Sequence, residues 1–244
     1  MSNLPKKLEN CPLVDAIIEI RFELSPNMNK NLVFPLIYAQ NKEIFTGQAT
    51  SLPISFVPEP VREQDVNYKY KPLYRVDGKE SILQVGTDVI CISSKMPYIG
   101  WDRLLELSIK VINSARDLGI IGKVTRLGHR YVNFFEGDIL DNLSIKINSN
   151  QQYVPIGKSY RLDLKYNDYI NVLQVSNMGR FQPIGSSERK GSIIDIDTSR
   201  NYDFDSFLEN MKEELNNAHE SEKTLFYSLL DNKLLTSLAP VYGK

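Results

Sequence analysis

The stretch that decides the fold runs from Pro12 to Leu24 and reads PLVDAIIEIRFEL. Alternate positions in it are apolar, at Val14, Ala16, Ile18, Ile20 and Phe22. The positions between them are mostly charged, at Asp15, Glu19, Arg21 and Glu23, and only Ile17 is out of step. Because a strand alternates its side chains between two faces, this pattern predicts a half-buried β-strand at the start of the fold.

A second long strand is predicted from Val124 to Phe135, and the order of elements repeats around it. In the first half a helix over residues 32–45, a set of strands and a long helix from Trp101 follow the opening strand. In the second half a short helix or turn, another set of strands and a long helix beginning near Asp203 or Asp205 follow. The expected strands cover residues 52–57, 68–76, 82–85 and 89–93 in the first half, and 143–147, 160–166, 170–175 and 192–197 in the second, with 234–244 as loop.

This repeated order predicts an α+β fold with an internal duplication, residues 1–120 forming one strand–helix–strands–helix repeat and residues 121–244 the other. The two repeats are expected to join into one compact unit, a curved antiparallel sheet with its helices packed on one face. The order is similar to that of the TATA-box-binding-protein-like and helix-grip folds. A similarity of order alone carries no function.

Composition bounds the classes of partner. The 244 residues carry a formal net charge of −1, so net charge gives no support to nucleic acid as a partner. No apolar run reaches the length of a membrane span and no leader precedes the first strand, which predicts a cytoplasmic protein without a membrane partner. Two cysteines, Cys11 and Cys91, form neither a disulfide framework nor a zinc site. No cofactor is expected.

Two groups of basic residues suggest an anion site. Arg126 and Arg130 share one face of the strand 124–135, and His129 lies on the other. The connection 179–191 is long and polar, and loops of that length are often functional. The speculative ligand residues are therefore Arg126, His129, Arg130, Arg180, Arg189 and Lys190. The alternative, common on exposed antiparallel faces, is that these charges pair with neighbouring acids.

Three further patterns offer chemistry, each with a plainer structural alternative. His219 and Glu222 are three apart on a helix and could hold a metal, but neither histidine belongs to a ligand-spaced cluster. Asp195 and Asp197 could hold magnesium or simply form a solvated strand face. The strand 68–76 carries tyrosines on one parity and cations on the other, so a regular strand would separate them and weaken a stacking platform. No metal site and no catalytic residue are predicted.

Four stretches resemble a family of sporadically distributed bacterial proteins of unknown function: PLVDAIIEIRF (12–22), GWDRL (100–104), RLGHRYVN (126–133) and the region 219–235. The resemblance covers about residues 10–240. It implies a prokaryotic cytoplasmic protein, and the family's patchy distribution suggests defence or mobile-element gene neighbourhoods. It supplies no catalytic residues.

The leading functional hypothesis is a non-enzymatic binding or interaction module, whose partner is another protein or a second copy of the chain. The first alternative is nucleic-acid or nucleotide binding through Arg126, Arg130 and the 179–191 connection. The second is a phosphate-handling hydrolase that uses Asp195, Asp197 or His219.

Overall fold

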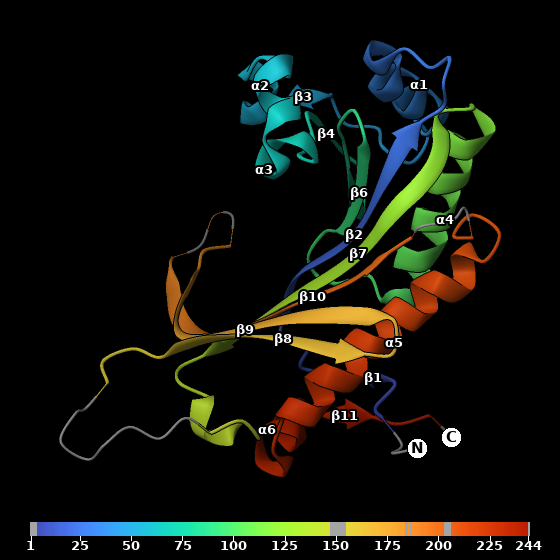
Figure 1. The fold of residues 1–244 in the computed structure, drawn as a ribbon. Helices are drawn as coiled ribbons and strands as arrows, with labels where there is room; N and C mark the ends of the chain where they lie inside the picture. Colours follow the sequence, from blue (N-terminus) through green and yellow to red (C-terminus); the bar gives the residue numbers. More distant parts are fainter. Residues whose placement is uncertain (1–3, 147–154, 184, 186, 203–205, 244) are drawn as a thin grey trace. The chain divides into compact units, whose positions relative to one another are not determined.

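A computed structural model describes residues 4–146, 155–183, 185, 187–202 and 206–243 (Figure 1). About 31% of the chain is helix and 38% strand, with a large antiparallel sheet and several helices on one face, so the predicted α+β class is confirmed. Among the described residues, no helix combines the length and apolar character needed to cross a membrane.

The first half of the chain contains the predicted opening strand and the predicted long helix. In order, its elements are β1 (Lys7–Leu8), β2 (Leu13–Leu24), η1 (Lys30–Leu32), α1 (Val33–Gln40), β3 (Thr50–Ser51), η2 (Pro53–Phe56), α2 (Glu59–Gln64), α3 (Val66–Lys69), β4 (Tyr74–Asp77), β5 (Ser81–Val85), β6 (Val89–Ser94) and α4 (Trp101–Asp117). The alternation in β2 is real, because Ala16, Ile18, Ile20 and Phe22 are all buried. Helix α4 ends before Gly119, which takes the positive φ of +66° that glycine tolerates best.

The second half opens on the other long predicted strand. Its elements are β7 (Ile121–Glu136), η3 (Leu140–Asn142), β8 (Ser159–Tyr166), β9 (Tyr169–Phe181), β10 (Arg189–Asn201), α5 (Met211–Leu229), α6 (Asn232–Ser237) and β11 (Pro240–Val241). The helix predicted from Asp203 or Asp205 begins later, at Met211, and both aspartates lie outside the described residues.

Several predicted strands are wrong, and local capping explains the main ones. Residues 53–56 form a 3-10 turn that starts at Pro53. The expected strand 68–76 begins as helix α3, because the Asp65 side chain accepts a hydrogen bond from the Asn67 N–H and caps it, and only 74–76 are strand. Asp231 caps α6 in the same way within the segment predicted as loop. Leu143 makes only an isolated bridge, and residue 147 lies outside the described residues.

The strands of each half follow the same topology. In the first half the hydrogen-bonded order is β3-β4-β5-β6-β2, with β3 a strand of two residues at the edge, and in the second half it is β7-β10-β9-β8. In both halves the long opening strand lies beside the last strand that follows it in the sequence, and the strand before that one comes next; β3 has no counterpart among the described residues of the second half. A separate two-stranded sheet joins β1 to β11. The common topology is what the predicted duplication requires, and a common origin of the halves stays a prediction.

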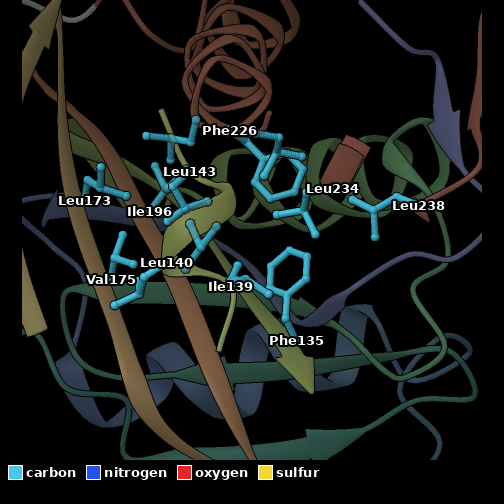
Figure 2. Packing of buried hydrophobic residues seen from close by; sticks show 13 residues of the cluster. Phe135, Ile139, Leu140, Leu143, Leu173, Val175, Ile196, Phe226, Leu234 and Leu238 are labelled. Atoms are coloured by element: carbon cyan, nitrogen blue, oxygen red, sulfur yellow. The ribbon is translucent and has the colours of Figure 1, made fainter. Parts of the chain in front are cut away.

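The chain divides into two compact units. The first unit contains Met1–Asp15, Arg130–Thr198 and Ala218–Lys244. Its core lies between α5, α6 and the strands, and Figure 2 shows Phe226 and Leu234 pointing toward Phe135 and Ile139. Thirteen buried apolar side chains make up this cluster. Burying each one stabilises the fold by about 1.5–3 kcal/mol relative to exposure.

The second unit contains Ala16–His129 and Ser199–Asn217. Helix α4 packs against β6 and α1. Its apolar stripe is buried, with Leu104, Val111 and Ile112 fully inaccessible to solvent. This packing leaves the opposite face of the sheet to polar side chains.

Candidate functional site

The outer face of the sheet in the second unit carries a row of polar side chains. Arg75 on β4 lies opposite Gln84 on β5, which lies opposite Cys91 on β6, and Cys91 lies opposite Glu19 on β2. Because successive side chains alternate across a strand, this row points away from the buried face that carries Ile18 and Ile92. The alternating charges of the opening strand therefore belong to the outer face.

Glu19 is shared by two arginines at the end of that row. Its Oε1 accepts a hydrogen bond of 2.8 Å from Arg21 Nε and one of 2.7 Å from Arg126 Nη1. The three side chains are 22%, 27% and 18% exposed respectively, so solvent reaches them without separating them. Arginines from two strands that are far apart in the sequence therefore meet on one carboxylate.

A glycine makes room for the second arginine. A Cβ at Gly128 would lie only 2.6 Å from Arg126 Nη1 and 3.6 Å from Glu19 Cβ. The Arg126 side chain therefore runs along β7 over the later residue Gly128, where it reaches Glu19. A side chain at position 128 would have to displace the guanidinium group.

Tyr70 brings an aromatic ring to the same place. Its ring lies 4.6 Å from the guanidinium carbon of Arg21 and 5.2 Å from Lys69 Nζ, both within the range of cation–π attraction. The expected separation of rings from cations along residues 68–76 is wrong here, because it assumed a regular strand. Residues 66–69 are helical, so strand alternation does not apply and ring and cations meet.

Lys71, like Arg21, Arg126 and Glu19, lies near enough to Cys91 to affect its pKa electrostatically. We name Arg21, Lys71, Arg126 and Glu19, with the ring of Tyr70, the cationic cluster. The segment at Lys71 is seated against the turn before β6, since a Cβ at Gly86 would lie 2.8 Å from the Lys71 carbonyl oxygen. The set thus gathers three basic side chains on a chain whose formal net charge is −1.

Cys91 lies beneath the cluster as a protonated thiol. Its Sγ is buried and lies 3.9 Å from Glu19 Oε2. Burial, with Glu19 adding to it, raises the pKa of the thiol well above its ordinary value, although Arg21, Lys71 and Arg126 lower it in part. A neutral thiol is a weak hydrogen-bond donor, so Cys91 is not poised as a nucleophile.

Two of the residues predicted for an anion site carry no available charge for it. His129 is fully buried, with its ring 5.2 Å from that of Trp101, and desolvation lowers its pKa to about 3. The imidazole is therefore neutral at physiological pH. Arg130 forms a bidentate pair with Asp195, whose two oxygens accept bonds of 2.8 and 2.6 Å. Arg130 therefore follows the alternative interpretation, in which the basic residues of this strand pair with acidic residues on a neighbouring strand.

The connection predicted over 179–191 is shorter than expected, because β9 continues to Phe181 and β10 begins at Arg189. Residues 184 and 186 within it lie outside the described residues. Arg180 pairs with Glu188 at 3.4 Å, and Arg189 pairs with Glu136 at 2.8 Å. Lys190 is exposed on β10. Acidic partners therefore neutralise both arginines of this arm.

A different kind of polar cluster lies inside the first unit. Asn171 Nδ2 donates to Ser221 Oγ at 3.1 Å, and Thr198 Oγ1 donates to Asn171 Oδ1 at 2.6 Å. All three side chains are at most 2% exposed, and we name them the neutral polar network. They join β9, β10 and α5 through groups that carry no charge.

Glu222 lies one turn after His219 on α5 and is 2% exposed. Its Oε1 has no hydrogen-bond partner among the described residues. Burial raises the pKa of this carboxyl from 4.5 to about 8. His219 Nδ1 lies 3.4 Å from the Tyr131 hydroxyl, and the ligand atoms of His219 and Glu222 lie within 4.8 Å of each other. The sequence showed the spacing of this pair, but gave no sign of its burial.

Neither protein-family models nor curated proteins give a match to this chain. The resemblance to a bacterial family accordingly stays a prediction. Of the cationic cluster, only Arg126 was named from sequence as a ligand residue. Glu19 and Arg21 were visible as charges on one face of a strand, but their convergence with Arg126 and Tyr70 depends on the pairing of distant segments.

Proposed function

We propose that this chain is a non-enzymatic binding module whose ligand is a nucleotide-like molecule, held by its phosphate at the cationic cluster. The observation that carries the proposal is the sharing of Glu19 by Arg21 and Arg126. The planar N–H donors of arginine match a phosphate group in geometry, and two guanidinium groups meet at this carboxylate.

Tyr70 supports the nucleotide part of the proposal. An aromatic ring beside a phosphate-binding cation offers a flat surface for a base, and stacking of this kind contributes about 1–3 kcal/mol. Here the ring already stacks with Arg21 at 4.6 Å, so ring and cation are available together.

The scale of the patch favours a small ligand over a nucleic-acid strand. Strand binding uses a groove of positive charge that follows many phosphates. Here the arginines of the β9–β10 arm are paired with Glu136 and Glu188, and the formal net charge is −1. A local group of three basic side chains is of a size to hold one phosphate group.

One of the three residues named for the hydrolase alternative, Asp195, is already engaged in an ion pair. Both oxygens of Asp195 accept hydrogen bonds from Arg130, so this carboxylate is already engaged. A carboxylate held in such a bidentate pair links two strands, and its oxygens are not positioned to accept a proton from a substrate.

The test is calorimetric titration of the purified chain with adenosine triphosphate, pyrophosphate and an oligothymidylate at low and at physiological salt. Adenosine triphosphate should bind more tightly than pyrophosphate, with affinity falling as salt rises. Arg126→Gln or Arg21→Gln should lower the affinity for adenosine triphosphate by about tenfold or more, the cost of a charged hydrogen bond. Tyr70→Leu should weaken adenosine triphosphate binding and leave pyrophosphate binding unchanged.

Arg116→Gln is the matched control, because Arg116 is an exposed arginine of the same unit paired only with its neighbour Asp117 among the contacts described. It should bind as the wild type does. Absence of adenosine triphosphate binding at low salt overturns the proposal, and so does equal loss in Arg116→Gln. Tighter binding of the oligothymidylate than of adenosine triphosphate would assign the cluster to nucleic acid instead.

A further inference from the structure

Strand β8 is an edge strand with one partner. It pairs with β9 along its whole length, from Ser159 opposite Ser176 to Tyr166 opposite Tyr169, and is the last strand in the hydrogen-bonded order (Figure 1). Within the described residues, its other side pairs with no strand. An edge of this kind presents unpaired N–H and C=O groups to any strand that can align with it.

The register with β9 decides which backbone groups point outward. The Asn177 N–H donates to the Lys158 carbonyl, which makes this a hydrogen-bonded pair of the antiparallel ladder. Hydrogen-bonded pairs recur at every second residue, so the even-numbered residues of β8 direct their backbone groups toward β9. The backbone groups of Arg161, Asp163 and Lys165 therefore point to the open edge.

The side chains of β8 divide into an apolar row and a charged row. The apolar row comprises Tyr160, Leu162, Leu164 and Tyr166. Tyr160 and Leu164 pack against the core cluster of the first unit, but Leu162 remains 37% exposed and Tyr166 47% exposed. The core thus covers this row incompletely, and a further strand beside it would extend the apolar surface.

The charged row is self-complementary. Its order is positive, negative, positive at Arg161, Asp163 and Lys165. Two copies can pair antiparallel so that Leu162 of one lies opposite Leu162 of the other. Arg161 of each copy then lies opposite Asp163 of the other copy, which gives two pairs of opposite charge. A shift that centres the pairing on Asp163 instead sets the two Asp163 carboxylates opposite each other and Arg161 opposite Lys165. Like charges directly opposite are destabilising, so charge selects the first register over the second.

We propose that the partner of β8 is a second copy of this chain, paired antiparallel through β8 with the two-fold axis at Leu162. In this register residues 159–165 of each copy pair, Leu162 meets Leu162, and Tyr160 meets Leu164. The outward backbone groups of Arg161 and Asp163 then form the hydrogen-bonded pairs. The two Leu162 side chains meet at the closer, non-hydrogen-bonded position. Because each copy contributes the same strand, the assembly stops at two copies, and the open β8 edge of each copy is then paired.

The test is the mass in solution, measured by size exclusion with light scattering over a wide range of protein concentrations. The wild type should form a concentration-dependent dimer. Arg161→Asp and Asp163→Arg each place like charges opposite in both symmetric pairs, and each should weaken the dimer by about tenfold or more. An equimolar mixture of these two variants should dimerise again, because every pair of opposing charges is then complementary.

Two more variants separate this register from a general effect of charge or of folding. Asp163→Pro removes an outward N–H that β9 does not use, so the variant should fold and fail to dimerise. Glu213→Arg makes the same change of charge as Asp163→Arg on an exposed site of α5 and should leave the dimer intact. A wild type that is monomeric at every concentration overturns the proposal. So does a dimer that survives Asp163→Arg, or a mixture that does not restore it.

Discussion

Glu19 and Glu222 are the same residue type in opposite surroundings. Glu19, on the outer face, is 22% exposed and accepts hydrogen bonds from Arg21 and Arg126. Glu222, inside the first unit, is 2% exposed, and its Oε1 has no partner among the described residues. Burial raises the pKa of the Glu222 carboxyl, whereas Glu19 has water and two guanidinium groups beside it. The contrast separates a surface that we propose to bind an anion from an interior joined by uncharged groups.

The largest expected effect is the pH dependence that Glu222 imposes on stability. The folded protein releases this proton near pH 8, whereas the unfolded chain releases it near 4.5. Between these values the folded state binds more protons, so the free energy of unfolding falls as pH rises, by up to about 1.4 kcal/mol per pH unit. Glu222→Gln should abolish this contribution, matching the wild type near pH 5 and exceeding its stability at pH 9.

Urea unfolding of both proteins from pH 5 to pH 9 measures the difference, in which the other titrating groups cancel. Glu220→Gln on the exposed side of the same helix is the control and should follow the wild type. Parallel curves for wild type and Glu222→Gln would show that Glu222 ionises normally in the fold.

Substitution in the neutral polar network should lower the free energy of unfolding by nearly as much. Asn171→Ala removes the partner of both Thr198 and Ser221, leaving two buried hydroxyl groups without their hydrogen bonds. The expected loss is about 2–3 kcal/mol in the free energy of unfolding. Asn201→Ala at the exposed end of β10 should change it little. Equal losses of stability in Asn171→Ala and Asn201→Ala would contradict the prediction, because the buried hydrogen bonds would then add no measurable stability.

Substitutions in the cationic cluster should lower the free energy of unfolding less than those in the neutral polar network. Glu19→Gln removes the carboxylate shared by Arg21 and Arg126, and should cost only about 1 kcal/mol because water can solvate both guanidinium groups. The same variant should bind adenosine triphosphate more tightly than the wild type, since a competing negative charge is gone. Glu23→Gln, an exposed position on the same strand, serves as the control for both measurements. Weaker binding by Glu19→Gln would mean that Glu19 orients the arginines.

Sequence patterns predicted well the elements that are long and strongly periodic. Strand β2, helix α4 and the hairpin from β4 to β5 follow directly from alternation, helical spacing and the Asp77–Gly78 turn. The errors fall on short segments, such as residues 66–69, where four residues cannot distinguish a capped helical turn from an alternating strand. The predicted loop over 179–191 failed because the long partner strands carried its ends into the sheet.

By itself the sequence determined the α+β class, the long elements β2, α4 and β7, and which face of β2 is charged, because local side-chain periodicity carries that information. Only the tertiary structure decided which charges matter. Arg130 is engaged by Asp195, Arg126 joins Arg21 at Glu19, and Glu222 loses its charge to burial. Each of these outcomes depends on which distant segment lies opposite the residue and on how much water that segment excludes. The spacing of residues along the chain predicts neither factor.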